Sequence, residues 1–253
     1  MSILKNKRIL ITGAGGLLGR SLVSGVVSAK GSVVAVDTDV ESMRNGLELP
    51  KNVRRNVEFL VLDVTNEKDM AEFFRSNITL DGAINAAYPR NKSYGAGFYD
   101  VSLESFNENL ALQLGSTFLL TQQCAAYFNV HKQPFSLVNL ASIYGSVAPR
   151  FEIYEGTAMT TPVEYAAIKS ATIHLSKYVA RFVGDISFRI NCVSPGGVLD
   201  AQDSTFVESY SKYSISKKML APDDIVSAAL FLLSDLAKHI TGQNLIVDDG
   251  WHL

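Results

Sequence analysis

Short apolar runs alternate with longer amphipathic stretches along the chain from its first residues onward. A short apolar run between turn residues is typical of a buried β-strand, and a longer amphipathic stretch predicts a helix that covers a sheet. The strands are expected at residues 8–12, 32–37, 57–63, 82–85, 136–141, 189–194 and 245–247. The helices are expected at residues 17–29, 67–75, 103–129, 163–183 and 222–234. This alternation predicts an α/β fold in which seven parallel strands form a doubly wound sheet flanked by helices.

No change in composition marks a second domain, so we expect residues 1–253 to form a single domain. Two segments interrupt the alternation, at residues 88–100 and 147–162, and a third irregular segment follows the sixth strand at 198–218. Long loops in an otherwise regular domain usually carry function or move. We therefore expect these loops to form the substrate side of the molecule, with solvated surface as the alternative interpretation.

The composition excludes several classes of partner and site. The chain has 23 basic and 25 acidic side chains and no basic run, so neither nucleic acid nor an anionic membrane is an expected partner. Cys124 and Cys192 are far apart and predict neither a disulfide framework nor a zinc site. The four histidines lack ligand spacing, so we expect no metal. No export signal and no run of about 20 apolar residues is recognisable, and we expect a cytoplasmic protein.

A glycine-rich turn, TGAGGLLG at residues 12–19, follows the first predicted strand and opens the first predicted helix. Its spaced glycines permit a tight turn, close approach of the backbone to a pyrophosphate, and close packing of helix on strand. The free N–H groups and the dipole at the helix N-terminus favour a diphosphate. The candidate contacts with a dinucleotide in this turn are Gly13, Gly15, Gly16, Leu17, Leu18 and Gly19.

The second predicted strand ends at Asp37, where a ribose-binding carboxylate is expected after such a turn. A carboxylate accepts hydrogen bonds from both ribose hydroxyls and repels a 2′-phosphate. Asp37 therefore predicts NAD(H) rather than NADP(H). Arg20 is the one nearby candidate for a phosphate contact, with a solvent-facing side chain as the alternative.

The ends of the third and fourth predicted strands supply further candidate cofactor contacts. These residues are Asp63, Val64, Asn85, Ala86 and Ala87. Asp63 is placed to meet the adenine edge of a cofactor, and an N-cap for the helix that begins near Glu67 is an equally good interpretation of the same side chain.

Three side chains form a candidate catalytic set. Ser142 follows the fifth predicted strand, and Tyr165 and Lys169 lie four residues apart on a predicted helix. This spacing places both side chains on one helix face, so the ammonium group can lie near the phenol. A neighbouring cation lowers the pKa of a tyrosine toward the range useful for acid/base chemistry, and Ser142 would hydrogen-bond the reacting oxygen.

Seven segments of the chain form a longer series of motifs. They are TGAGGLLG at 12–19, DVT at 63–65, NAA at 85–87, ASIYG at 141–145, YAAIKSA at 165–171, RINCVSPGGV at 189–198 and ITGQNLIVDDG at 240–250. In this order they resemble the motifs of the short-chain dehydrogenase/reductases, over nearly the whole chain. The resemblance implies a Rossmann-type sheet and hydride transfer between substrate and nicotinamide.

The resemblance also implies roles for single residues. Tyr165 is the implied general acid/base, Lys169 holds the nicotinamide ribose and lowers the pKa of the tyrosine, and Ser142 orients the substrate oxygen. The family's relay asparagine aligns with Gln113, and Asn109 lies one turn earlier, so either residue is a candidate for that role. The residues implied to line the nicotinamide face are Pro195, Gly196 and Val198.

Three segments carry a closer resemblance, AYPRNK at 87–92, FNENL at 106–110 and the run from 141 to 156. They resemble bacterial flagellin-modification oxidoreductases tied to nonulosonic, legionaminic-type sugar biosynthesis. The implied substrate is a nucleotide-activated or phosphorylated amino sugar. The candidate substrate residues are the basic side chains Arg90, Lys92 and Arg150, which suit phosphate, and the rings Tyr88 and Tyr154, which suit stacking on a base or sugar. Solvated surface charge is the alternative interpretation of the basic residues.

Two other functions remain open at this point. One is a sensor or scaffold that binds NAD(H) without turnover, suggested by the bulky Tyr88 and by Gln113 at the asparagine position. The other is a dehydrogenase for a different small carbonyl or alcohol. Family likeness further implies a homotetramer or homodimer built partly from the helices at 103–129 and 163–183.

Overall fold

The computed structural model describes residues 2–47 and 54–253, and within them seven strands form one parallel sheet. The strand order is β3-β2-β1-β4-β5-β6-β7, so the chain moves outward from β1 in one direction and then in the other. The strands are β1 (Arg8–Thr12), β2 (Ser32–Asp37), β3 (Val57–Val61), β4 (Gly82–Asn85), β5 (Phe135–Leu140), β6 (Phe188–Pro195) and β7 (Asn244–Val247). Ligands of such sheets bind beyond the carboxyl ends of the strands, where the order reverses between β1 and β4.

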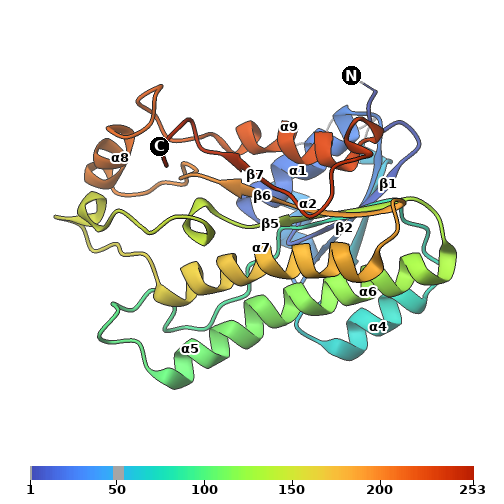
Figure 1. Cartoon of the computed structure of the whole chain (residues 1–253), viewed down its shortest axis with the longest axis horizontal. Coiled ribbons are helices and arrows are strands. Elements are labelled where there is room, and N and C mark those ends of the chain that lie inside the picture. The colour runs from blue at the N-terminus through green and yellow to red at the C-terminus, as the bar shows by residue number, and fades with distance from the viewer. Residues whose placement is uncertain (1, 48–53) are drawn as a thin grey trace.

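Helices cover both faces of this sheet. They are α1 (Leu17–Ser28), α2 (Val40–Gly46), α4 (Glu67–Arg75), α5 (Leu103–Asn109), α6 (Ser116–His131), α7 (Val163–Val183), α8 (Ser204–Ser211) and α9 (Pro222–Leu233). Figure 1 shows α1 and α9 on one face and α4, α6 and α7 on the other, with α8 beyond the end of the sheet. This arrangement confirms the predicted α/β, doubly wound fold.

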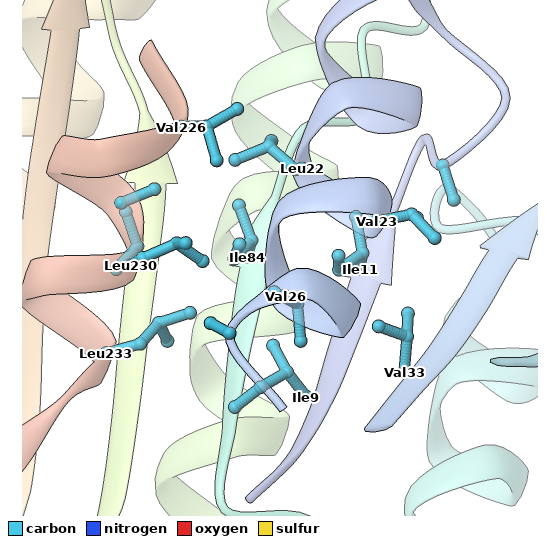
Figure 2. Close-up of a cluster of buried hydrophobic side chains, with 14 of the residues drawn as sticks. Ile9, Ile11, Leu22, Val23, Val26, Val33, Ile84, Val226, Leu230 and Leu233 are labelled. Carbon is cyan, nitrogen blue, oxygen red and sulfur yellow. The ribbon is translucent and has the colours of Figure 1, made fainter. Parts of the chain in front are cut away.

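The packing of α1 against α9 closes one layer of the core. Leu22 and Val26 of α1 and Leu230 of α9 lie over the central strands, where they join Ile9 and Ile84 in a continuous apolar cluster (Figure 2). Full burial of an aliphatic side chain contributes about 1.5–3 kcal/mol relative to exposure. The first and the last long helices of the chain therefore stabilise the same face of the sheet.

Most predicted elements are confirmed to within two residues, but three details differ. Two short helices, α2 and α8, were not predicted, and each begins at an aspartate N-cap: Asp39 accepts a hydrogen bond from Ser42 N at 2.9 Å, and Asp203 from Thr205 N at 2.8 Å. The predicted continuous helix at 103–129 is interrupted by a π-helical segment, Leu110–Gly115, between α5 and α6.

No helix within the described ranges combines the length and the apolar composition needed to cross a bilayer. The same residues contain no cluster of three or more His, Cys, Asp or Glu side chains that could hold a metal ion.

Candidate active site

Two adjoining cavities lie at the carboxyl ends of the central strands. The larger, of about 610 Å³, contains the candidate catalytic residues, and the smaller, of about 380 Å³, contains Asp37 and Asp63. Residues of the glycine turn and the stretch after β4 line both cavities, namely Gly16, Ala86, Ala87 and Tyr88. The two cavities thus run side by side over the switch in strand order, where a dinucleotide and a substrate bind in this class of sheet.

The glycine turn has the geometry that its sequence predicts. Gly13 has a φ of +66°, a left-handed conformation that favours glycine. A Cβ atom at Gly19 would lie 2.0 Å from the carbonyl oxygen of Gly13, so helix α1 approaches the turn too closely for any side chain. The N-terminus of α1 has no side-chain cap and no acidic residue in its first turn, which leaves its N–H groups free for an anion. A dinucleotide diphosphate fits this cradle.

Asp37 lines the smaller cavity and is held in place by backbone donors. Its carboxylate accepts hydrogen bonds from Gly15 N at 2.9 Å and from Thr38 N at 2.8 Å. These bonds tie the end of β2 to the glycine turn. The carboxylate lies at the edge of the cavity, where it can meet a ribose and would repel a 2′-phosphate.

Asp63 and Val64 also line the smaller cavity. The Asp63 carboxylate accepts hydrogen bonds from the backbone N and the hydroxyl of Thr65, at 2.9 and 2.7 Å. The N-cap of α4 is Asn66, which accepts from Lys68 N at 3.0 Å. The alternative interpretation of Asp63 as that N-cap is therefore wrong, because Asp63 lies three residues before Asn66 and its carboxylate bonds Thr65 rather than an N–H of the helix.

Asn85 lies beneath the cavities rather than in their walls. Its amide donates to Thr117 Oγ1 at 3.2 Å and to Asn139 Oδ1 at 3.3 Å, and its carbonyl accepts from Thr12 Oγ1 at 3.1 Å. These bonds join β1, β4, β5 and α6. Asn85 thereby fixes the floor of the site, whereas Ala86 directly lines both cavities.

The candidate catalytic set comes together in the larger cavity. Ser142 follows β5, while Tyr165 and Lys169 project from the first two turns of α7, and all three side chains line the same space. Lys169 Nζ donates a hydrogen bond to the carbonyl oxygen of Leu140 at 2.8 Å and lies 5.6 Å from the centre of the Tyr165 ring. The predicted spacing therefore brings cation, phenol and hydroxyl to one place.

Burial sets the ionisation of this group. It raises the pKa of Tyr165 above its ordinary value, and the hydrogen bond with the Ser142 hydroxyl offsets only part of this rise. The predicted lowering of this pKa by Lys169 is therefore not seen, because burial outweighs it. Burial also lowers the pKa of Lys169 to about 8. A lysine with this pKa is mostly charged at neutral pH, so it can stabilise a phenolate. Because its pKa lies close to neutral pH, it can also lose its proton readily.

The two candidates for the relay position are buried, and neither lines the larger cavity. Asn109 donates to Asn91 Oδ1, to Ser105 O and to Glu164 Oε1, each at 3.1 Å. Gln113 lies in the π-helical segment near the Tyr94 hydroxyl, and neither polar atom of its side chain makes a hydrogen bond of normal geometry among the described residues. Asn109 is thus part of a structural network, while Gln113 has hydrogen-bonding capacity to spare beside the site.

The end of β6 forms another wall of the larger cavity. Pro195, Gly196 and Val198 all line it. Val198 also bridges to Leu220, which holds the segment after β6 against the start of α9.

The candidate substrate residues divide into two groups. Tyr88, Arg90 and Tyr154 line the larger cavity. Lys92 and Arg150 do not, and the Arg150 guanidinium instead lies over the rings of Tyr213 and Trp251, at 4.5 and 5.3 Å. Arg150 thus links the 147–162 loop to the C-terminal segment.

Several lining residues were not identified from the sequence. They are Tyr144, Thr161, Asp200, Gln202, Phe206 and Tyr210. Tyr144 belongs to the motif at 141–145, Thr161 lies in the predicted loop at 147–162, and the other four lie in the segment at 198–218. The positions of these segments were the available signal. The rings of Tyr154, Phe206 and Tyr210 pack in series onto Trp251, which is 1% exposed.

The chain is similar to known proteins along nearly its whole length. A family model described as enoyl-(acyl carrier protein) reductase matches residues 15–252. The chain is 36% identical over 258 residues to post-translational flagellin modification protein A from Campylobacter coli, covering 99% of this chain and 100% of that protein. It is 28% identical over 259 residues to a 7alpha-hydroxysteroid dehydrogenase from Bacteroides fragilis, covering 99% of this chain and 96% of that protein.

The comparison with solved structures agrees. A short chain dehydrogenase from Leptospira borgpetersenii, solved with bound NAD+, superposes with a TM-score of 0.87 at 31% identity, covering 99% of this chain and 94% of that one. With the glycine turn, Ser142, Tyr165 and Lys169 arranged around one cavity, the chain belongs to the short-chain dehydrogenase/reductase family of oxidoreductases.

Proposed function

We propose that this protein is an NAD-dependent oxidoreductase that acts on a hydroxyl or keto carbon of a nucleotide-activated or phosphorylated amino sugar used to modify flagellin or another surface glycan. The observation that carries the proposal is the larger cavity, in which Ser142, Tyr165 and Lys169 share one space with Arg90 and with aromatic rings. A guanidinium beside the catalytic set suits a phosphate or diphosphate. The similarity to a flagellin modification protein supports the biological setting.

The residues around the smaller cavity support NAD as the cofactor. We propose that the glycine turn and the N-terminus of α1 hold the diphosphate, that Asp37 holds the adenosine ribose, and that Asp63 and Val64 meet the adenine. Lys169 would hold the nicotinamide ribose. When bound, the nicotinamide ring supplies the site that accepts or donates hydride. The Asp37 carboxylate favours NAD over NADP because a 2′-phosphate would lie against a negative charge.

The chain's own residues then handle the proton. In the oxidative direction Tyr165 accepts the proton of the substrate hydroxyl, the Lys169 ammonium stabilises the phenolate form, and Ser142 donates a hydrogen bond to the reacting oxygen. Gln113 or Asn109 would connect this proton to bulk water, and the free polar atoms of Gln113 favour the former.

The test is the change in nicotinamide absorbance with UDP-, GDP- and CMP-sugars and with sugar phosphates, with NAD(H) and NADP(H) in parallel. Tyr165→Phe is the matched variant, because it removes only the phenol oxygen. We expect turnover with one sugar class and a loss of about 10²–10⁴-fold in the variant. If the protein binds NADH but none of these compounds reacts, it is a sensor or scaffold, or a dehydrogenase for another alcohol. Full turnover by Tyr165→Phe would refute the role of the tyrosine.

We further propose that residues 1–253 act as one cofactor-binding domain in a cytoplasmic homotetramer or homodimer, with the loops at 88–100, 147–162 and 198–218 on the substrate side. Helices α6 and α7 pack side by side (Figure 1). They leave Phe118, Tyr178 and Phe182 exposed around a groove of about 490 Å³. An apolar face of this kind suits contact with a second copy. Light scattering that finds only monomer at micromolar concentration would contradict the assembly.

A further inference from the structure

The Lys169 ammonium is a partly buried charge in the cavity wall, and its surroundings are unusual for such a group. Its one hydrogen bond is to the carbonyl oxygen of Leu140, and none of the ion pairs in the described part of the chain includes it. A buried charge is costly unless another group compensates it. The remaining compensation comes from two aromatic faces: Nζ lies 5.6 Å from the centre of the Tyr165 ring and 5.5 Å from that of Tyr88.

Tyr88 contacts both members of the catalytic pair. Besides covering the ammonium, its ring lies edge to face against Tyr165, with centroids 5.9 Å apart and planes at 87°. The Arg90 guanidinium lies 5.7 Å from the same ring. Tyr88 lines both cavities and is 38% exposed, so it occupies the junction between them.

The loop at 88–100 holds this ring firmly. The Tyr88 hydroxyl hydrogen-bonds that of Tyr94, and the backbone N of Asn91 donates to Asn109 Oδ1 at 3.0 Å. Asn109 in turn donates to the buried Glu164, the residue before Tyr165. The loop is thus tied to the first turn of α7 through one network, which fixes the distance between the Tyr88 ring and the catalytic pair.

We propose that Tyr88 is a positioning residue for the Tyr165–Lys169 pair: its π-face stabilises the charged form of Lys169, and its edge-to-face contact fixes the Tyr165 ring. The role in catalysis rests on the proposed function, whereas the interaction with Lys169 does not. The groups that face Lys169 are Tyr88, Tyr165 of α7 and the Cys192 thiol of β6. Burial raises the pKa of Cys192 to about 11, so this thiol is neutral near pH 8. Besides the hydrogen bond to the Leu140 carbonyl, the aromatic faces are therefore what stabilises the charge.

The test measures the ionisation of Lys169 in the full chain without substrate or cofactor. The protein is acetylated with trace acetic anhydride across a pH series, beside a free amine of known pKa, and labelling of the Lys169 peptide is followed by mass spectrometry. A cation–π contact of this kind corresponds to a shift of about half to one and a half pH units. We expect Tyr88→Leu, which keeps apolar cover but removes the π-face, to lower the labelling midpoint by that amount.

Three further variants sharpen the result. Tyr88→Phe keeps the ring and should retain the wild-type midpoint. Tyr144→Leu removes a different ring from the same cavity and should also leave it unchanged. Tyr88→Met repeats the loss of the ring with another apolar side chain, in case the leucine variant does not fold.

An unchanged or raised midpoint in Tyr88→Leu and Tyr88→Met would overturn the proposal, as would a fall of equal size in Tyr88→Phe. Failure of the sugar panel, by contrast, would refute the proposed substrate and leave the labelling result standing. Once a substrate is in hand, the limb of the pH–rate profile that reports Tyr165 should move in Tyr88→Leu and not in Tyr88→Phe.

Discussion

Replacing Gly19 by alanine would place a methyl carbon 2.0 Å from the carbonyl oxygen of Gly13. The closest carbon–oxygen contacts in proteins are about 3.3 Å, so the new atom is about 1.3 Å too near. The other close neighbours are backbone atoms of Ala14, at 2.8 and 2.9 Å, and no side-chain rotation can relieve the contact. Helix α1 or the glycine turn must therefore move.

The cost follows from the packing on both sides of this contact. Overpacking a buried position costs about 1–3 kcal/mol, and in a protein of this size each kcal/mol lowers the Tm by about 2–4 °C. We expect Gly19→Ala to melt about 2–12 °C lower than wild type. Because the turn is the proposed diphosphate site, its displacement should also weaken NADH binding about tenfold or more, measured by fluorescence titration.

Gly16→Ala is the matched control. A Cβ atom there meets only the Gly13 carbonyl oxygen, at 3.3 Å, and otherwise extends into open space. This variant should melt within about 2 °C of wild type, yet bind NADH more weakly because Gly16 lines both cavities. Wild-type Tm and wild-type NADH affinity in Gly19→Ala would show that the turn does not have the described geometry.

Three other substitutions test separate parts of the molecule. Asp37→Ser combined with Thr38→Arg removes the carboxylate and adds a guanidinium, so the affinity for NADPH relative to NADH should rise at least about tenfold; an unchanged ratio would exclude Asp37 as the selector. The pKa of Lys169 falls from 10.5 to about 8 on burial, so its charge costs stability below about pH 8, and this cost disappears as the pH rises toward 10.5. Lys169→Met should accordingly be more stable than wild type toward urea at pH 7, with the difference shrinking by pH 10, whereas a constant difference would contradict the burial argument. Trp251→Ala should lose about 3–5 kcal/mol in urea unfolding because the ring is 1% exposed, while Leu253→Ala, at an 87% exposed position, should lose less than about 0.5 kcal/mol; similar losses would mean that the tail is not anchored by the tryptophan.

The sequence was most informative where burial and regular structure coincide. Both faces of the central strands are covered by helices, so β1, β2 and β4 are continuous apolar runs with clear ends, and their predicted bounds match the structure. The short helices lacked such a signal. In α2 only Met43 is buried, and in α8 only Phe206 and Tyr210, so neither shows a sustained helical period.

The hydropathy pattern does not predict the π-helical segment, and the reason is different. Hydropathy does not reveal which carbonyl each N–H selects, so nothing in the sequence distinguishes the π-helical residues 110–115 from the α-helices on either side. In the candidate site, too, the sequence pattern predicts some positions and not others. Motif spacing brought Ser142, Tyr165 and Lys169 together, because Ser142 closely follows β5 and the other two lie on α7. It gave no direction for Arg150, whose partners Tyr213 and Trp251 come from distant parts of the chain.

The pairing of α1 with α9 has a consequence for synthesis of the protein. During translation α1 emerges near the beginning, but the helix that covers it, α9, is complete only when residue 233 has left the ribosome. Until then Leu22 and Val26 lack their apolar neighbours from α9, and β1 lacks its partner β4 until residue 85 has emerged. The nascent chain therefore exposes the apolar face of α1 for most of its elongation, and the unpaired edge of β1 until residue 85 has emerged. Exposed surfaces of this kind promote aggregation of incompletely folded chains. The glycine turn, the proposed diphosphate site, is thus among the first segments to be synthesised. The helix that follows it, α1, gains its packing against α9 only near the end of synthesis.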